Sequence, residues 1–132
     1  MGSRSDLQRI DHVVFTMPDI DITCSFYHHV LGMEVNTADD GRKVLRFGES
    51  KINFHEVGSE FEERAQRPEP GTEDLCLITT TPIQDVIVQI RGAGIDIDGP
   101  MPRMGALGRI ESVYLRDPDG NLIEIARYIS GG

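Results

Sequence analysis

The stretch Asp117-Pro118-Asp119-Gly120-Asn121-Leu122-Ile123-Glu124-Ile125 indicates how the end of the chain folds. Asp-Pro-Asp-Gly is a strong turn signal, because proline presets φ and glycine accepts a positive φ. Strand-forming residues flank the turn at 110–115 and 122–128, so the segment predicts a β-hairpin. Within Leu122–Ala126 of the second strand Glu124 is the one charge, and its neighbours Ile123 and Ile125 point to the other face. An unpaired buried carboxylate is costly, so Glu124 either pairs with a cation or faces a wet cavity.

The composition of the whole chain limits the class of protein. A length of 132 residues predicts one domain with its own hydrophobic core. The net charge of −9 argues against binding to nucleic acid or to an anionic membrane surface. Cys24 and Cys76 form no CxxC motif, which is typical of a reducing cytosol. No apolar run is long enough to span a membrane and no signal peptide opens the chain, so we expect a cytoplasmic protein.

One order of elements occurs twice along the chain, and the hairpin ends the second copy. The first copy comprises a strand at Ile10–Thr16, a helix at Ile20–Leu31 capped by Asp19 or Asp21 and ended by Gly32, and strands at Met33–Thr37, Lys43–Phe47 and Lys51–Val57. The second comprises a strand at Glu73–Thr79, a helix at Pro82–Arg91, a short strand at Ile95–Ile97, a Gly/Pro-rich loop at Gly99–Gly108, and the hairpin. Each copy therefore predicts a βαβββ unit.

Two such units side by side predict an α+β fold, in which paired βαβββ modules form a curved mixed sheet with the helices on its outer face. We place module one at residues 9–57, a linker at 58–72 with one helical turn around Phe61–Ala65, and module two at 73–128. Residues 1–8 and 129–132 are expected to be tails. The sheet face without helices would then form a cleft.

Several side chains that bind metals share the strand faces that should line this cleft. Apolar residues alternate with them and would face the helices. The candidates are His12 on the first strand, Asn53 and His55 on the fourth, Asp74 and Cys76 on the fifth, and Glu124 on the last. Imidazole and carboxylate ligands together suit Zn²⁺, Ni²⁺, Mn²⁺ or Fe²⁺, and open coordination positions are typical of a catalytic site.

Structural interpretations of the same residues stay open at this point. His12 could be a core histidine that donates to a backbone carbonyl, and Asp74 could cap the start of a strand. His55 could lie in solvent at a strand end, and Cys76 could be a small buried residue. All of these residues fall on the strand faces that should line the cleft, and this shared placement favours a metal site over separate structural roles.

Three stretches resemble the vicinal oxygen chelate superfamily, which includes glyoxalase I, extradiol dioxygenases, fosfomycin-resistance transferases and bleomycin-binding proteins. They are Ile10–Phe15, Phe26–Gly32 and Leu115–Glu124. Further likeness to small glyoxalase-domain proteins lies in Lys51–Glu56, Asp74–Thr79 and Gly99–Arg103. The resemblance covers about residues 9 to 128, and the segment that ends in Glu124 is its most specific part.

The resemblance implies a divalent metal held by the first and last strands of each module. It makes His12 the first-strand ligand and Glu124 the last-strand carboxylate. The fourth-strand ligand falls at Asn53 or His55, depending on a one-residue gap, and we choose His55 as the better donor. The fifth-strand position, usually His in the family, is Asp74 here.

The activity implied by the resemblance is the isomerisation of a hemithioacetal formed from a 2-oxoaldehyde and a thiol, as in lactoylglutathione lyase. Glu124 would be the general base, and Arg103, Asn53 and Cys76 would contact the substrate. Two alternatives use the same cleft: an Fe²⁺-dependent dioxygenase with His12, His55 and Glu124 as ligands, and a metal-free protein that binds an antibiotic. Short two-module members usually dimerise, so we expect a homodimer.

Overall fold

The computed structural model describes residues 5–58 and 63–129. Strands and helices alternate in the order that the sequence predicts, with small shifts of their ends. Module one contains β1 (His12–Met17), α1 (Ile20–Leu31), β2 (Glu34–Thr37), β3 (Lys43–Phe47) and β4 (Ser50–Glu56). Module two contains β5 (Asp74–Ile78), α2 (Ile83–Gly92), β6 (Asp98–Gly105), β7 (Gly108–Arg116) and β8 (Leu122–Tyr128).

Each module forms a four-stranded mixed sheet with the same connectivity. The order is β1-β4-β3-β2 in the first sheet and β5-β8-β7-β6 in the second. The first strand of each module runs parallel to the last, and the other neighbours are antiparallel. The predicted α+β fold of paired βαβββ modules is therefore confirmed, and β1 and β5 are the outermost strands of their sheets.

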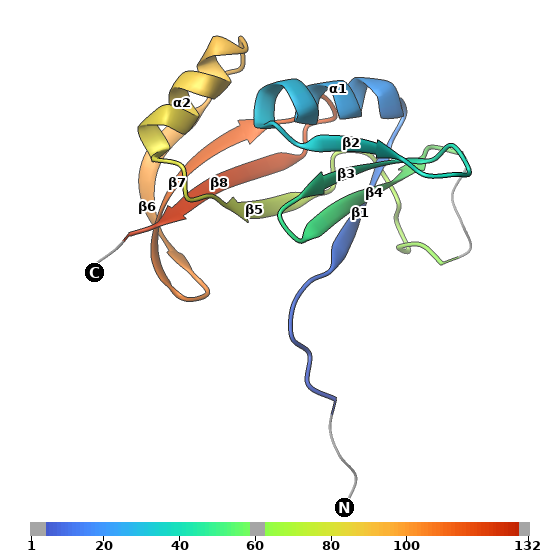
Figure 1. Ribbon diagram of the computed structural model, residues 1–132, viewed down its shortest axis with the longest axis horizontal. Coiled ribbons are helices and arrows are strands. Elements are labelled where there is room, and N and C mark those ends of the chain that lie inside the picture. The colour runs from blue at the N-terminus through green and yellow to red at the C-terminus, as the bar shows by residue number, and fades with distance from the viewer. Residues whose placement is uncertain (1–4, 59–62, 130–132) are drawn as a thin grey trace, which may run out of the picture.

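Both helices lie over one side of the sheets (Figure 1). Helix α1 begins at Asp19, whose Oδ1 accepts a hydrogen bond from the Ile22 N–H at 3.1 Å, and it ends at Gly32 with φ 73°. Of the two predicted caps, the structure selects Asp19. In α2 the residues that face the sheet are spaced as an amphipathic helix requires: Ile83, Val86, Ile87 and Ile90.

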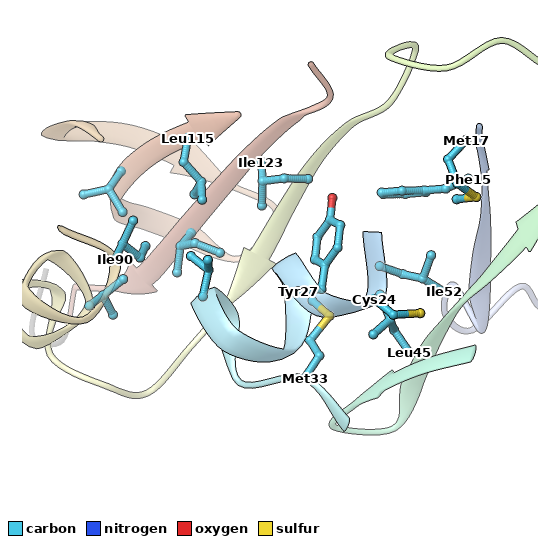
Figure 2. Close-up of a cluster of buried hydrophobic side chains, with 14 of the residues drawn as sticks. Phe15, Met17, Cys24, Tyr27, Met33, Leu45, Ile52, Ile90, Leu115 and Ile123 are labelled. Atoms are coloured by element: carbon cyan, nitrogen blue, oxygen red, sulfur yellow. The ribbon is translucent and has the colours of Figure 1, made fainter. Parts of the chain in front are cut away.

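One hydrophobic core joins the two modules. Figure 2 shows Tyr27 of α1 between Phe15 and Ile52 of module one and Ile123 of module two. Tyr27 is fully buried, and its ring packs edge-to-face on Phe15 with 5.9 Å between the ring centroids. The Gln89 side chain of α2 adds a polar link by donating to the Val30 carbonyl of α1 at 2.9 Å.

The segment around residues 95–108 corrects the sequence prediction. Ile95–Ile97 is not a strand, and the expected loop at Gly99–Gly108 is largely strand β6. Pro100 and Pro102 indicated a loop in the sequence, because proline donates no ladder hydrogen bond and is uncommon inside a sheet. Strand β6 tolerates them because it is the edge strand of its sheet and pairs with β7 alone.

The predicted linker has no regular structure in its described part. Residues 63–72 contain neither helix nor strand, and Phe61 and Glu62 of the expected helical turn lie outside the described residues. Residues 5–11 precede β1 and are exposed. No helix in the described part of the chain has the length and apolar character needed to span a membrane.

Candidate functional site

The sheet face of module one that lies opposite the helix is polar. Phe15, Met17, Ile52 and Phe54 belong to the core. Because side chains alternate along a strand, the residues between them point to the other face, as the sequence predicts for His12, Asn53 and His55. That face borders a cavity of about 760 Å³. Its lining includes His12, Val14, Lys43, Lys51, Asn53 and His55.

The register of β1 against β4 decides which of these residues are neighbours. His12 pairs with Lys51, Val14 with Asn53, and Thr16 with His55. His12 and His55 are therefore four residues apart along parallel strands, which is roughly 13 Å. Side chains that rise in parallel from one sheet face do not converge over that distance. Asn53, one diagonal step from His12, is the closer partner.

Asn53 and His12 both have features of ligand-binding residues. The side-chain oxygen of Asn53 is buried and has no hydrogen-bond partner among the described residues. A buried unpaired acceptor is costly and indicates a missing ligand. Nδ1 of His12 lies 2.9 Å from the Asp11 carboxylate. In metal sites, a carboxylate often holds one imidazole nitrogen in this way and leaves the other for the ion.

The corresponding face of module two carries Glu124. Ser112 Oγ donates to Glu124 Oε2 at 2.5 Å, and the register places Cys76 on β5 and Tyr114 on β7 directly beside Glu124. Desolvation, with the charge of Glu124 and a hydrogen bond to it, raises the pKa of Cys76 to about 11. Cys76 is therefore a protonated thiol near neutral pH and no nucleophile. Glu124 is half-buried, and its neighbours on this face are the Ser112 hydroxyl, Cys76 and Tyr114.

Arg103 lies on β6 rather than in a loop. Its Nε donates to the Tyr114 hydroxyl at 3.0 Å, and the guanidinium lies 5.7 Å from the centre of that ring. Arg103 pairs with Ile110 and Tyr114 with Glu124, so Arg103, Tyr114 and Glu124 share one face. Asp74, at the start of β5, is exposed and lies two residues before Cys76 on this same face.

The two polar faces remain separate within one chain. Neither Glu124, Asp74, Cys76 nor Arg103 borders the cavity that contains His12 and Asn53. Within residues 5–58 and 63–129, no three His, Cys, Asp or Glu side chains gather closely enough to hold a metal ion. The candidate ligands thus lie on two separate faces, His12 with Asn53 and His55 on module one and Glu124 with Asp74 on module two, and we call these the two candidate half-sites.

Three residues of these faces were missed in the sequence: Lys51, Ser112 and Tyr114. Strand alternation could have found Ser112 and Tyr114, because they alternate with the buried Val113 and Leu115. Their contact with Glu124, however, depends on the pairing of β7 with β8.

Comparison with known proteins establishes the family. Residues 9–125 match the Glyoxalase/Bleomycin resistance protein/Dioxygenase superfamily. The chain belongs to this superfamily. The resemblance found in the sequence is therefore confirmed.

Two relatives within the superfamily are similar over most of the chain. Virulence protein STM3117 of Salmonella typhimurium is 54% identical over 124 residues, which cover 93% of this chain and 86% of the relative. Its crystal structure matches with a TM-score of 0.92, covering 95% of this chain and 100% of that one. The glyoxalase domain-containing protein RDO1 of Mycosarcoma maydis is 46% identical over 92% of this chain and 69% of the relative.

A more distant structure shares the glyoxalase-like fold alone. Lactoylglutathione lyase from Agrobacterium tumefaciens has a TM-score of 0.70 at 20% identity, covering 93% of this chain and 96% of that one. At this identity the match supports the architecture and not the activity.

Proposed function

We propose that this protein is a divalent-metal-dependent enzyme that acts on a small substrate with two adjacent oxygens. The observation that carries the proposal is the buried side-chain oxygen of Asn53, which has no partner among the described residues and lies diagonally across from His12. A nitrogen and an oxygen donor fit Zn²⁺, Ni²⁺, Mn²⁺ or Fe²⁺. Asn53 thus takes the ligand position that the sequence prediction gave to His55.

Glu124 and Asp74 would complete the site from a second copy of the chain. The two candidate half-sites do not share a cavity within one chain, whereas a two-fold dimer in which module one of each copy packs against module two of the other would bring them together twice. Strands β1 and β5, which carry His12 and Asp74, each lie at an edge of their sheet, where a strand can pair with another chain. The site would thus be shared across a homodimer.

In this site Glu124 would act as the general base. A divalent ion held by His12, Asn53 and Glu124 would polarise the two adjacent oxygens and acidify the neighbouring C–H bond. The Glu124 carboxylate would take that proton and return it to the adjacent carbon. The Ser112 hydroxyl, 2.5 Å from Oε2, would orient the carboxylate so that one oxygen faces the substrate.

Isomerisation of a 2-oxoaldehyde hemithioacetal is the reaction class that we favour. It needs one carboxylate base near the adjacent oxygens, and Glu124 supplies it. The dioxygenase alternative requires His12 and His55 on one ion, and the four-residue offset of the two histidines argues against that. The antibiotic-binding alternative requires no metal, and the pairing of His12 with Asp11 disfavours it.

Metal analysis of purified, reconstituted protein tests the site. We expect wild type and His55→Gln to bind metal, and His12→Ala, Asn53→Leu and Glu124→Ala to bind it at least about tenfold more weakly, as the loss of a ligand predicts. His55→Gln is the matched control, because His55 lies on the same strand face as Asn53. Equal metal binding in all five proteins, or in none, would refute the site.

Activity assays then separate the reactions. With Ni²⁺ or Zn²⁺ we expect turnover of methylglyoxal plus a thiol, and loss of this turnover in Glu124→Ala. Oxygen uptake with Fe²⁺ and a catechol, without isomerase activity, would instead show that the protein is a dioxygenase.

A further inference from the structure

Lys51 lies on the same sheet face as the half-site of module one. It pairs directly with His12, and Asn53 follows two residues later on the same face. All three residues line the cavity of about 760 Å³. Neighbouring strands are about 4.8 Å apart and two residues advance a strand by about 6.6 Å, so the three residues are close enough for one small molecule in the cavity to contact all of them.

Lys51 differs in its ion pairing from the other cations that line the cavity. Lys43 contacts Asp21 at 2.6 Å and Arg42 contacts Asp40 at 2.9 Å. Lys51 has no ion-pair partner within 4.0 Å among the residues that the structure describes. Its charge is therefore available to a bound molecule.

Asp11 interacts with Lys51 without forming an ion pair, and the His12 hydrogen bond and the Arg9 charge lower the pKa of Asp11 more than the Lys51 charge does. Asp11 already contacts His12 at 2.9 Å and Arg9 at 3.5 Å. Glu56 lies five residues along β4 from Lys51, at the opposite end of the strand and roughly 17 Å away. Glu63 belongs to the segment before β5 and also borders a second cavity with Thr16 and His55, at that same far end.

We propose that Lys51 binds an anionic group of the substrate, a carboxylate in the simplest case, next to the oxygens held at His12 and Asn53. The inference rests on the proposed function, because His12 and Asn53 fix where the oxygens lie. It narrows the substrates, including any hemithioacetal, to those that carry an anionic group near the two oxygens. In a chain of net charge −9, a local cation is needed to attract such an anion, and the cavity is large enough for both groups.

A matched pair of probes isolates the charge. 3,4-Dihydroxybenzoate and 3,4-dihydroxybenzamide have the same adjacent oxygens and nearly the same size, but only the first is an anion. Calorimetric titration of the Mn²⁺-loaded protein should give at least about tenfold tighter binding of the benzoate, as expected for a charge-assisted hydrogen bond. In Lys51→Met the preference should vanish. In Lys43→Met, which alters the same cavity at a cation already paired with Asp21, it should remain.

The outcomes separate this inference from the proposed function. Equal binding of the two probes, binding of neither, or an unchanged preference in Lys51→Met would overturn the role of Lys51, whether or not the protein binds Mn²⁺. Lys51→Met should still bind Mn²⁺ as wild type does, whereas His12→Ala should not. If the protein binds no metal, the same titration is carried out on the metal-free protein, because the Lys51 ammonium attracts an anion whether or not a metal is bound. A preference for the benzoate in that titration supports the role of Lys51, and equal binding of the two probes overturns it.

Discussion

Asp117, in the turn that follows β7, accepts hydrogen bonds from several directions in a buried position. The Tyr27 hydroxyl donates to Oδ2 at 2.6 Å and Asn121 Nδ2 donates to the same oxygen at 2.8 Å. The backbone N–H groups of Asp119 and Asn121 donate to Oδ1. Burial and the Asp117 carboxylate raise the pKa of Tyr27, which keeps its hydroxyl protonated as a donor. This turn therefore anchors module two to helix α1 of module one.

Removing the Tyr27 hydroxyl should destabilise the fold. Tyr27→Phe leaves the buried Asp117 carboxylate with one donor fewer, and the expected loss is about 1–3 kcal/mol in the free energy of unfolding, measured by urea denaturation. Tyr128→Phe is the control, because Tyr128 accepts a hydrogen bond from the exposed Leu107 N–H and water can replace it. Equal effects of the two substitutions would contradict the anchoring role.

Asp119 should make stability depend on pH. Burial first, and then the negative charge of Asp117, raise the pKa of Asp119. A raised pKa in the folded state means that the ionised carboxylate opposes folding above that pKa, and that the penalty disappears as the pH falls through it. Asp119→Asn should therefore be more stable than wild type by a few tenths of a kcal/mol at about pH 7, with the difference fading toward about pH 4.

Denaturation at several pH values measures this difference. Asp96→Asn, at an exposed position before β6, is the control substitution. A stabilisation by Asp119→Asn that grew as the pH fell would have the wrong sign for this explanation.

Among the elements, β6 depends on close backbone approach to β7. Gly99 has φ 112°, and a Cβ atom there would lie 2.7 Å from the Ser112 carbonyl oxygen. Ser112 in turn donates to Glu124. A side chain at position 99 would therefore displace the strand that orients the candidate base.

Gly99→Ala should lower the free energy of unfolding by about 1 kcal/mol or more beyond the effect of Gly41→Ala. Gly41 is a matched control, because its φ of 87° brings similar backbone strain while nothing lies within 4 Å of a Cβ atom there. Thermal denaturation of both variants measures the difference. If both substitutions lower the free energy of unfolding equally, the close approach of β7 is not the reason that position 99 requires glycine.

At the level of the whole molecule, the separation of the half-sites predicts complementation between chains. If each site combines His12 of one copy with Glu124 of the other, a dimer of one His12→Ala chain and one Glu124→Ala chain has one intact site and one site that lacks both ligands. Mixing the two variants, with exchange of subunits, should restore about a quarter of the wild-type metal sites.

Metal content of the mixture, measured against each variant alone, checks this prediction. A mixture with no more metal than its components would show that the site is not shared between chains. Sedimentation of the wild type provides the independent measurement, since a monomer would exclude a shared site.

Local patterns predicted most of the fold and the faces of the strands. The alternation of apolar residues predicted that His12, Asn53 and Glu124 point away from the core. Asp19, one of the two predicted caps, begins α1 and Gly32 ends it. These features follow from neighbours within a few residues, which a sequence displays directly. The family resemblance supplied the function class that these patterns alone did not reach.

The partners of each residue depended on contacts far apart in the chain. A strand can slide by two residues against its neighbour and keep the same face toward the core, so alternation could not choose between Asn53 and His55. The register of β1 against β4 places Asn53 closer to His12 than His55 is, which supports the proposal of Asn53 as the ligand. Packing likewise turned a proline-rich segment into edge strand β6, and it left the candidate metal ligands divided between two faces, because register and packing are set by the whole fold.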